Sequence, residues 1–241
     1  MGINVTPFNS YDHALECLSH RIAERKKTLC IAINPIKVYK AKQNTELSVI
    51  LSNKADICLC DGIGIVYALR LLSGQSIKRC TGVQTFFKII ERACQTEWKI
   101  FLLGASQKSN ELACLRLRQE YPNLRIAGQH HGYFKDDDAI IEQINSSQAD
   151  VLFAAMGSPL QEEWLGKHKD SINASFLIGI GGTLDVISGY TKWAPKFFRK
   201  TGTEFLYRLV KEPFRWKEQL DLLKFSMMVL RAMFVSNDKD V

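Results

Sequence analysis

The sequence predicts an α/β protein with a Rossmann-like parallel sheet that helices cover on both faces. Three observations lead to this fold class. Short apolar segments alternate with stretches of helical periodicity, the apolar segments are uninterrupted, and nearly every one ends in Gly or a polar residue. Strands that are apolar throughout are typical of parallel sheets, because both faces of such a sheet are buried.

Six segments share the short, uninterrupted apolar composition of a buried strand. They are residues 29–33, 57–60, 99–103, 124–127, 151–156 and 176–180. Turn-forming residues follow most of them, and the first is followed by Asn34-Pro35, which reads as a break in the chain. The order of these segments along the chain predicts a sheet built through helical crossovers.

Helices are predicted between the strands, where apolar residues recur three and four positions apart. The apolar positions lie within residues 14–22, 66–72, 86–93, 110–121, 139–144 and 164–165. Ser10 and Thr81 are suitable N-caps for the first and third of these helices, and Pro122 stops the fourth. We divide the chain into an α/β core, residues 1–190, and a basic helical appendage, residues 191–241.

Composition excludes several classes of protein. The 241 residues are 46% apolar and 24% charged, which excludes a disordered chain. The N-terminus lacks the pattern of a secretory signal, and no run of about 18 apolar residues predicts a membrane span. The seven cysteines are odd in number and mostly lie in apolar stretches, which predicts reduced, buried thiols in a cytoplasmic protein.

Positive charge is concentrated in the appendage. The formal net charge is +7, and residues 192–231 hold ten basic and four acidic side chains. This asymmetry predicts an anionic partner, such as nucleic acid, lipid head groups or a phosphorylated substrate.

Residues 214–234 predict an amphipathic helix within that appendage. Its polar stripe is formed by Lys217, Asp221, Lys224 and Arg231. Its apolar stripe is formed by Leu220, Leu223, Met227, Leu230 and Phe234, flanked by Leu222, Phe225, Val229 and Met233. We expect this helix to lie in the surface of an anionic membrane. The alternative is a helix packed on the core or in the interface of a homo-oligomer.

The ends of the predicted strands are the expected ligand site, because ligands of open parallel sheets bind beyond the carboxyl ends of the strands. Glycine turns at these ends predict a nucleotide or sugar-nucleotide site. Asp61 directly ends a strand, so it is either a general base or a turn and helix cap. Asp185 follows the Gly181-Gly182-Thr183 turn and either complements a helix dipole or hydrogen-bonds a ribose or base. Complete dinucleotide-binding and P-loop motifs are absent from the sequence.

Several longer blocks occur in a characteristic order. They are Gly132-Tyr133-Phe134, residues 155–162 with Gly157-Ser158-Pro159 and Gln161-Glu162, residues 179–185 with Gly189, Ala194-Pro195, and residues 202–215 with Glu204, Arg208, Glu212-Pro213 and Arg215. Together these blocks resemble the WecG/TagA/CpsF family of bacterial glycosyltransferases over about residues 34–215. Within that family, Asp61-Gly62-Ile63, residues 132–135 and Tyr207-Arg208-Leu209 are most similar to the UDP-N-acetyl-D-mannosaminuronic acid transferases of enterobacterial common antigen synthesis.

The resemblance implies an inverting, UDP-sugar-dependent hexosyltransferase. It implies transfer of an N-acetylmannosamine-type sugar, with N-acetylmannosaminuronic acid as the first choice, to undecaprenyl-pyrophosphate-linked GlcNAc. The enzyme would act in cell-surface polysaccharide synthesis, as a peripheral protein on the cytoplasmic face of the bacterial cytoplasmic membrane. Because arginines of the appendage and the turn at residues 181–183 can stabilise the departing pyrophosphate, we expect no metal and no cofactor.

The resemblance also implies the site residues. Asp61 and Gln161 are the expected catalytic residues. The expected substrate-binding residues are Asn34, Arg79, Gly104, Tyr133, Gly157, Ser158, Glu162, Gly181, Gly182, Thr183, Asp185, Arg208 and Arg215. Ala32 and Gln84 depart from the family pattern, in which Thr and Asp are frequent, and we expect both to line the cleft.

A non-enzymatic alternative remains at this point. Phe197, Phe198, Phe214 and Trp216 are interleaved with Lys and Arg, as in modules that bind nucleic acid. The number and order of the family blocks favour the enzyme, so we expect no nucleic-acid partner.

Overall fold

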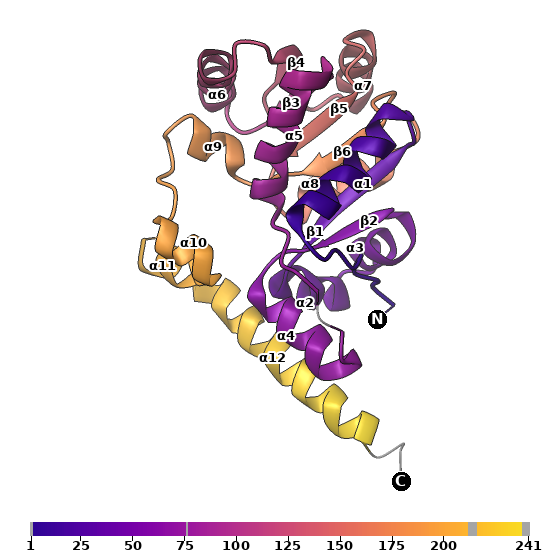
Figure 1. Ribbon diagram of the computed structural model, residues 1–241, viewed down its shortest axis with the longest axis vertical. Coiled ribbons are helices and arrows are strands. Elements are labelled where there is room, and N and C mark those ends of the chain that lie inside the picture. Colours follow the sequence, from indigo (N-terminus) through magenta and orange to yellow (C-terminus); the bar gives the residue numbers. More distant parts are fainter. Residues whose placement is uncertain (1, 76, 212–215, 238–241) are drawn as a thin grey trace.

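The computed structural model describes residues 2–75, 77–211 and 216–237, and it confirms the predicted fold class (Figure 1). Within these residues lies a six-stranded, fully parallel sheet with the strand order β2-β1-β6-β5-β3-β4. The strands are β1 (Thr28–Ile33), β2 (Ile57–Cys60), β3 (Lys99–Gly104), β4 (Arg125–His130), β5 (Val151–Ala155) and β6 (Phe176–Gly179).

The six strands lie where the apolar segments predicted them, within three residues at each end. Strands β1, β2, β5 and β6 are buried along their whole length, whereas the edge strand β4 is exposed or half-buried at every residue. The connections after β3 and after β5 leave in opposite directions, since β3 leads outward to β4 and β5 leads inward to β6. Such a switch point in strand order is where open α/β sheets bind ligands.

Two helical layers cover the sheet. One layer contains α2 (Pro35–Gln43), α3 (Thr45–Val49), the π-helical turn η1 (Ile50–Lys54), α4 (Ile63–Ser73), α7 (Asp137–Ser146) and α8 (Leu160–His168). The other layer contains α1 (Tyr11–Ala23), α5 (Gly82–Thr96), α6 (Gln107–Glu120) and α9 (Thr183–Ile187). Each layer encloses its own apolar core against one face of the sheet.

The caps and thiols follow the sequence predictions. Ser10 accepts from the backbone N–H of His13, and Thr81 accepts from that of Gln84, so both are N-caps. All seven cysteines are free thiols, and five of them are buried. These predictions are therefore confirmed.

One stretch was read wrongly from the sequence. Asn34-Pro35 does not simply break the chain: the Asn34 side chain accepts from the N–H of Lys37 at 2.8 Å and caps α2, while Pro35 occupies the first helical position. Proline is favoured there because the first backbone N–H groups of a helix have no helical acceptor. The helices α2, α3 and η1 that follow were not predicted.

The appendage contains α10 (Lys196–Thr201), α11 (Glu204–Lys211) and α12 (Trp216–Asn237). The long helix α12 runs along α2 and α4 (Figure 1). Phe225 and Val229 are buried in the core beneath them, and Lys224 lies over the ring of Tyr39, 5.4 Å from its centroid. None of the described helices is both long enough and apolar enough to span a bilayer.

The predicted amphipathic helix is confirmed over residues 216–237, and its two apolar sets separate. The flanking residues Phe225 and Val229 pack on the core, whereas the predicted stripe residues stay exposed. Their exposed fractions are 40% for Leu220, 61% for Leu223, 53% for Met227 and 53% for Leu230. The side chains of Lys217 and Phe234 and the whole of Phe214 lie outside the described residues.

Candidate functional site

Asp61 lies where three strands and a helix meet. It directly follows β2, and its backbone N–H donates to the carbonyl oxygen of Ile33 at the end of β1. Its Oδ2 accepts from the backbone N–H of Gly82, the first residue of α5, at 3.2 Å. A Cβ placed on Gly82 would lie 3.8 Å from that carboxylate oxygen and 3.8 Å from the carbonyl oxygen of Gly179 in β6. Asp61 is thus held at the shared edge of β1, β2 and β6 and is half-buried.

Asp61 was expected to be either a general base or the cap of the helix that follows it. The helix that follows it, α4, has Gly62 as its N-cap and no side-chain cap, so Asp61 does not cap that helix. Its carboxylate instead accepts a hydrogen bond from the N–H of Gly82 at the start of α5. The carboxylate stays half-buried at the strand ends, where a general base is expected to meet a substrate hydroxyl.

The loop before α5 fixes that arrangement. Cys80 donates its N–H to the Cys60 carbonyl at 2.8 Å, and Thr81 donates its N–H to the Tyr11 hydroxyl at 2.6 Å. Burial, and after it the charge of Asp61, raises the pKa of Cys60 to about 12. Burial together with Asp61 also raises the pKa of Cys80 to about 11. Both thiols therefore stay protonated and act as apolar packing around the carboxylate.

A buried polar network lies beneath the neighbouring strand ends. Lys37 donates through Nζ to the carbonyl oxygen of Ala32 at 2.7 Å and to Oε1 of Glu162 at 2.8 Å. The same Oε1 accepts from Nε2 of Gln161 at 2.8 Å, and Oε1 of Gln161 accepts from the N–H of Gly181 at 3.0 Å. The network therefore connects β1, α2 and α8 to the turn after β6.

This network changes what Gln161 and Glu162 can do. Their exposed fractions are 3% and 1%, and that of Lys37 is 4%. Such side chains do not present their polar atoms to a surface ligand. In this arrangement they set the position of the Gly181 turn instead, and Lys37 supplies the cation without which a buried carboxylate is very unfavourable.

The turns after β5 and β6 place glycines next to open space. Gly157 and Gly181 have φ values of 80° and 55°, which favour glycine, and a Cβ added to either would meet nothing within 4 Å. Ser158 and Gly182 are exposed beside them. Thr183 is buried, and its hydroxyl donates to the carbonyl of Ile180. The backbone of these turns, rather than Thr183, is what they can offer a ligand.

Gly104 and Tyr133 lie at the ends of β3 and β4. Gly104 has φ 125°, and a Cβ there would lie 2.4 Å from the backbone of Ala155, so this position requires glycine for close packing against β5. Tyr133 follows β4 and is 80% exposed. These two residues lie on the far side of the switch point from Asp61.

Asp185 joins α9 to α6. Its Oδ1 accepts from the Ser109 hydroxyl at 2.7 Å, and Ser109 also shares a hydrogen bond of 2.8 Å with Ser188. The side chain of Asp185 therefore has a structural partner and remains half-buried. The hydrogen bond to a ribose or base that the sequence suggested stays a prediction.

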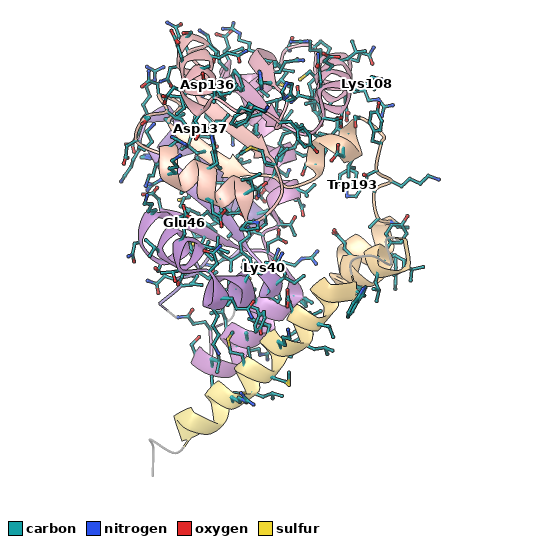
Figure 2. All side chains as sticks on the ribbon, turned by 180° about the vertical axis from the view of Figure 1, so that it is seen from behind. Lys40, Glu46, Lys108, Asp136, Asp137 and Trp193 are labelled. Atoms are coloured by element: carbon teal, nitrogen blue, oxygen red, sulfur yellow. The ribbon has the colours of Figure 1, made fainter. Side chains whose placement is uncertain are left out.

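The appendage touches the core beside Asp61. A Cβ on Gly202, in the turn between α10 and α11, would lie 2.5 Å from a guanidinium nitrogen of Arg79 and 3.2 Å from Cβ of Ile63. Arg79 belongs to the loop before α5, and Ile63 follows Asp61 by two residues. Figure 2 shows Trp193 on the extended segment between α9 and α10, and its ring stacks on Phe87 of α5. The appendage thus contacts the core at Trp193, before the Gly202 turn, and again along α12, after it.

The two predicted arginines of the appendage lie partly or wholly outside the described residues. Arg208 belongs to α11, but its side chain lies outside the described residues, as does the whole of Arg215. Their contact with substrate stays a prediction.

The two departures from the family pattern lie close to Asp61. Ala32 is buried, and its Cβ would lie 3.1 Å from a Cβ on Gly82. Gln84 is exposed in the first turn of α5. Ala32 thus packs beside Gly82, the residue whose N–H binds the Asp61 carboxylate, and a side chain at position 82 would crowd Ala32.

The prediction of metal independence also rested on the absence of a D-x-D motif, and this reading was wrong, because Asp136-Asp137-Asp138 has that spacing. Asp136 caps α7 by accepting from the N–H of Ala139 at 3.1 Å. Hydrogen bonds from Trp164, Lys167 and His168 lower the pKa of Asp137, against a smaller opposing effect of burial. Figure 2 labels both carboxylates at the start of α7. Across residues 2–75, 77–211 and 216–237, no three His, Cys, Asp or Glu side chains are grouped as metal ligands.

Sequence reasoning missed Lys37, Tyr11 and Ser109. Lys37 follows the N-cap Asn34 by three residues, but its partner Glu162 lies 125 residues later in the sequence, so no local pattern marks the pair. For Tyr11 and Ser109 the partners Thr81 and Asp185 are about 70 residues away in sequence, and no local pattern marks them.

Comparison with known proteins agrees with this geometry. Residues 1–239 match the model of the "Glycosyl transferase WecG/TagA/CpsF family". A protein of Bacillus spizizenii is 32% identical over 86% of this chain and 80% of its own length, and one of Bacillus subtilis is 32% identical over 95% and 87%. A Staphylococcus aureus protein is 35% identical over 69% of this chain and 65% of its own length. All three are named N-acetylglucosaminyldiphosphoundecaprenol N-acetyl-beta-D-mannosaminyltransferase. The chain therefore belongs to the WecG/TagA/CpsF family of glycosyl transferases.

Proposed function

We propose that this protein transfers an N-acetylmannosamine-type sugar from UDP to GlcNAc linked to undecaprenyl diphosphate, as a step in the synthesis of a cell-surface polysaccharide. The observation that carries the proposal is the position of Asp61, a carboxylate held at the joint edge of β1, β2 and β6 by the N–H of Gly82. The names of the relatives support the acceptor and the sugar class.

The reaction is a single displacement with inversion. A hydroxyl oxygen of the acceptor GlcNAc forms a bond to the anomeric carbon of the donor while the bond from that carbon to the UDP oxygen breaks. Asp61 takes the proton of the attacking hydroxyl, and UDP leaves with the bonding electron pair. The negative charge that develops on the diphosphate needs donors or cations, for which the Gly181-Gly182 turn and the arginines of the appendage are the candidates.

The buried network supports this chemistry indirectly. Gln161 holds the N–H of Gly181, and Glu162 and Lys37 hold Gln161. We propose that Gln161 and Glu162 act by positioning that turn. The proposed contacts of Asn34, Gly104, Tyr133, Gly157, Ser158 and Asp185 with substrate belong to the same proposal.

The donor sugar is tested by direct transfer. We propose UDP-N-acetylmannosaminuronic acid as donor in enterobacterial common antigen synthesis, which the sequence blocks favour, whereas the named relatives are mannosaminyltransferases. Full-length protein is incubated with UDP-N-acetylmannosaminuronic acid, UDP-N-acetylmannosamine or UDP-GlcNAc and a lipid-linked GlcNAc acceptor, and the product mass is measured. Transfer of the uronic acid supports the full proposal. Transfer of N-acetylmannosamine alone corrects the donor, and transfer of neither sugar contradicts the function.

The appendage arginines give a kinetic prediction. We expect Arg208→Ala and Arg215→Ala each to lower kcat/KM roughly 10- to 100-fold, because a charge-assisted contact with a diphosphate contributes about 1.5–3 kcal/mol. Steady-state kinetics with varied donor measures the effect, and Arg118→Ala on α6 serves as the control. Unchanged kinetics in both appendage variants would show that the appendage does not reach the diphosphate.

Metal independence gives a second prediction. Transfer should proceed at the same rate after dialysis against EDTA, because cationic side chains are proposed to neutralise the leaving group. The initial rate is compared before chelation, after chelation and after adding Mg²⁺ or Mn²⁺. A rate that falls with EDTA and returns with either metal would contradict this prediction.

We also propose that the exposed apolar stripe of α12 rests on the membrane face that carries the acceptor. Leu223, Met227 and Leu230 are more than half exposed on the side of α12 that is not buried on the core. Basic residues of the appendage add roughly 1 kcal/mol each near anionic head groups. A homo-oligomer that covers the same stripe is the alternative.

The stripe can be tested without removing α12. Leu223→Asp combined with Met227→Asp should abolish sedimentation with anionic vesicles, because both side chains are exposed and their replacement leaves Phe225 and Val229 in place. Leu115→Asp on α6, 51% exposed, is the matched control. Vesicle binding by the stripe variant at the wild-type level would remove α12 as the anchor, and a change in oligomeric state would favour the interface instead.

A further inference from the structure

An apolar cavity lies on the other face of the sheet from α5. It is a cavity of about 410 Å³ between α2, α4, α12 and the N-terminal segment, within the size range of ligand pockets. Its wall is apolar and includes Val5, Ile33, Val38, Ile65, Leu69 and Met228. Lys42 is the only described lining residue whose side chain carries a charge.

The N-terminal segment is fixed as one wall of this cavity. Thr6 donates its backbone N–H to the Cys58 carbonyl at 2.9 Å, and its hydroxyl oxygen accepts from the Cys58 N–H at 3.1 Å. Val5, the preceding residue, is therefore held beside the outer strand β2. On the opposite side, Phe225 and Val229 of α12 complete the wall.

The cavity begins next to the proposed reaction site. Ile33 directly precedes Asn34, and Ile65 is three residues after Gly62, about 4.5 Å along a helix axis. Asp61 points toward Gly82 and α5, so the rim formed by the ends of β1 and β2 separates its carboxylate from the cavity. A long ligand with its head at Asp61 reaches the cavity by crossing this rim.

The lining selects the chemistry of the occupant. An apolar wall excludes phosphates and sugars and favours hydrocarbon, and each methylene that leaves water strengthens binding roughly fourfold. The acceptor in the relatives' names carries such a chain, because its diphosphate is esterified to undecaprenol. We propose that this cavity binds the first isoprene units of the lipid-linked acceptor, an inference that rests on the proposed function.

The cavity-lining side and the exposed side of α12 then have different functions. Phe225, Met228, Val229 and Ala232 line the cavity, whereas Leu223, Met227 and Leu230 do not and remain exposed. Fatty acyl chains of the bilayer would meet the exposed side first. The isoprenoid chain is joined to the GlcNAc-diphosphate that the reaction site binds, so it reaches the cavity from that side. We therefore assign the cavity to the acceptor.

The test uses acceptors that need no bilayer. GlcNAc-diphosphate esters with one and with three isoprene units are compared in solution, with full-length protein. Wild type should prefer the longer acceptor by at least about tenfold in kcat/KM, since several buried methylenes separate the two. Ala68→Phe, inside the cavity, and Ala232→Phe, at its exposed rim, should remove this preference by lowering kcat/KM for the three-unit acceptor far more than for the one-unit acceptor. Ala139→Phe on the exposed face of α7 should keep it.

Direct binding separates this inference from the proposed function. Calorimetry with farnesyl diphosphate and isopentenyl diphosphate needs no turnover and should show the same loss of preference in both cavity variants. If wild type catalyses no transfer but binds farnesyl diphosphate with this preference, and the cavity variants lose the preference, the cavity assignment is supported and the proposed function is wrong. A wild type with no preference, or a preference that survives in Ala232→Phe, overturns the assignment. Loss of vesicle binding in the cavity variants with the preference intact overturns it in favour of a bilayer acyl chain.

Discussion

Asp61→Asn should lower kcat by about 10²–10⁴ while UDP-sugar binding changes little, because general-base catalysis contributes a factor of that size. The substitution is nearly isosteric, and the amide oxygen can still accept from the N–H of Gly82, so the start of α5 keeps its hydrogen bond. The variant therefore removes the proton acceptor and keeps the hydrogen bond to Gly82. Single-turnover kinetics and calorimetric titration of the donor measure the two quantities.

The control for this variant is Asp138→Asn, at an exposed position in the first turn of α7. It makes the same chemical change away from the strand ends and should keep the wild-type kcat. A near-normal kcat in Asp61→Asn would assign Asp61 to a structural role at the start of α5. A loss of donor affinity as large as the loss of kcat would assign it to binding.

Lys37→Met should lower the free energy of unfolding by about 3–5 kcal/mol, because it leaves the Glu162 carboxylate buried without its cation. Glu162 is 1% exposed, and one of its oxygens, Oε2, is buried without a hydrogen-bond partner among the described residues. The other oxygen would keep only the amide of Gln161. Denaturant unfolding with far-UV circular dichroism measures the change. Lys42→Met, exposed on the same helix, should change stability by less than about 0.5 kcal/mol.

A second substitution identifies the cause. Adding Glu162→Gln to Lys37→Met removes the buried charge, so the double variant should recover part of the lost stability. A double variant that is less stable than Lys37→Met alone would show that packing around the Lys37 stem, rather than the charge of Glu162, accounts for the loss. A cost below about 1 kcal/mol for Lys37→Met would show that water reaches the carboxylate.

The strands could be predicted because their signal is local. Residues 29–33 and 151–156 are uninterrupted apolar runs, and burial on both faces of a parallel sheet requires that composition. The helices between β1 and β2 were missed because Asn34-Pro35 is compatible with two local structures, a turn and the start of a helix. The choice between them depends on packing of the following residues against α8 and α12, which sequence periodicity alone does not contain.

The candidate site was predicted less completely. The position of Asp61 followed from its place after a strand, because the end of a parallel strand fixes where the next side chain lies. The roles of Gln161 and Glu162 did not follow, since their burial depends on Lys37, more than 120 residues earlier. Similarly, the amphipathic pattern of α12 was correct, but only the structure shows that Phe225 faces the core while Leu223 is exposed.

The central claim is a single displacement in which Asp61 removes the proton of the acceptor. The most direct test is the anomeric configuration of the new glycosidic bond, measured by NMR on product made from an α-linked UDP donor by the full-length protein. We expect a β-linked product. An α-linked product would require two displacements or a retaining mechanism, and it would contradict both the single displacement and the role of Asp61 as base.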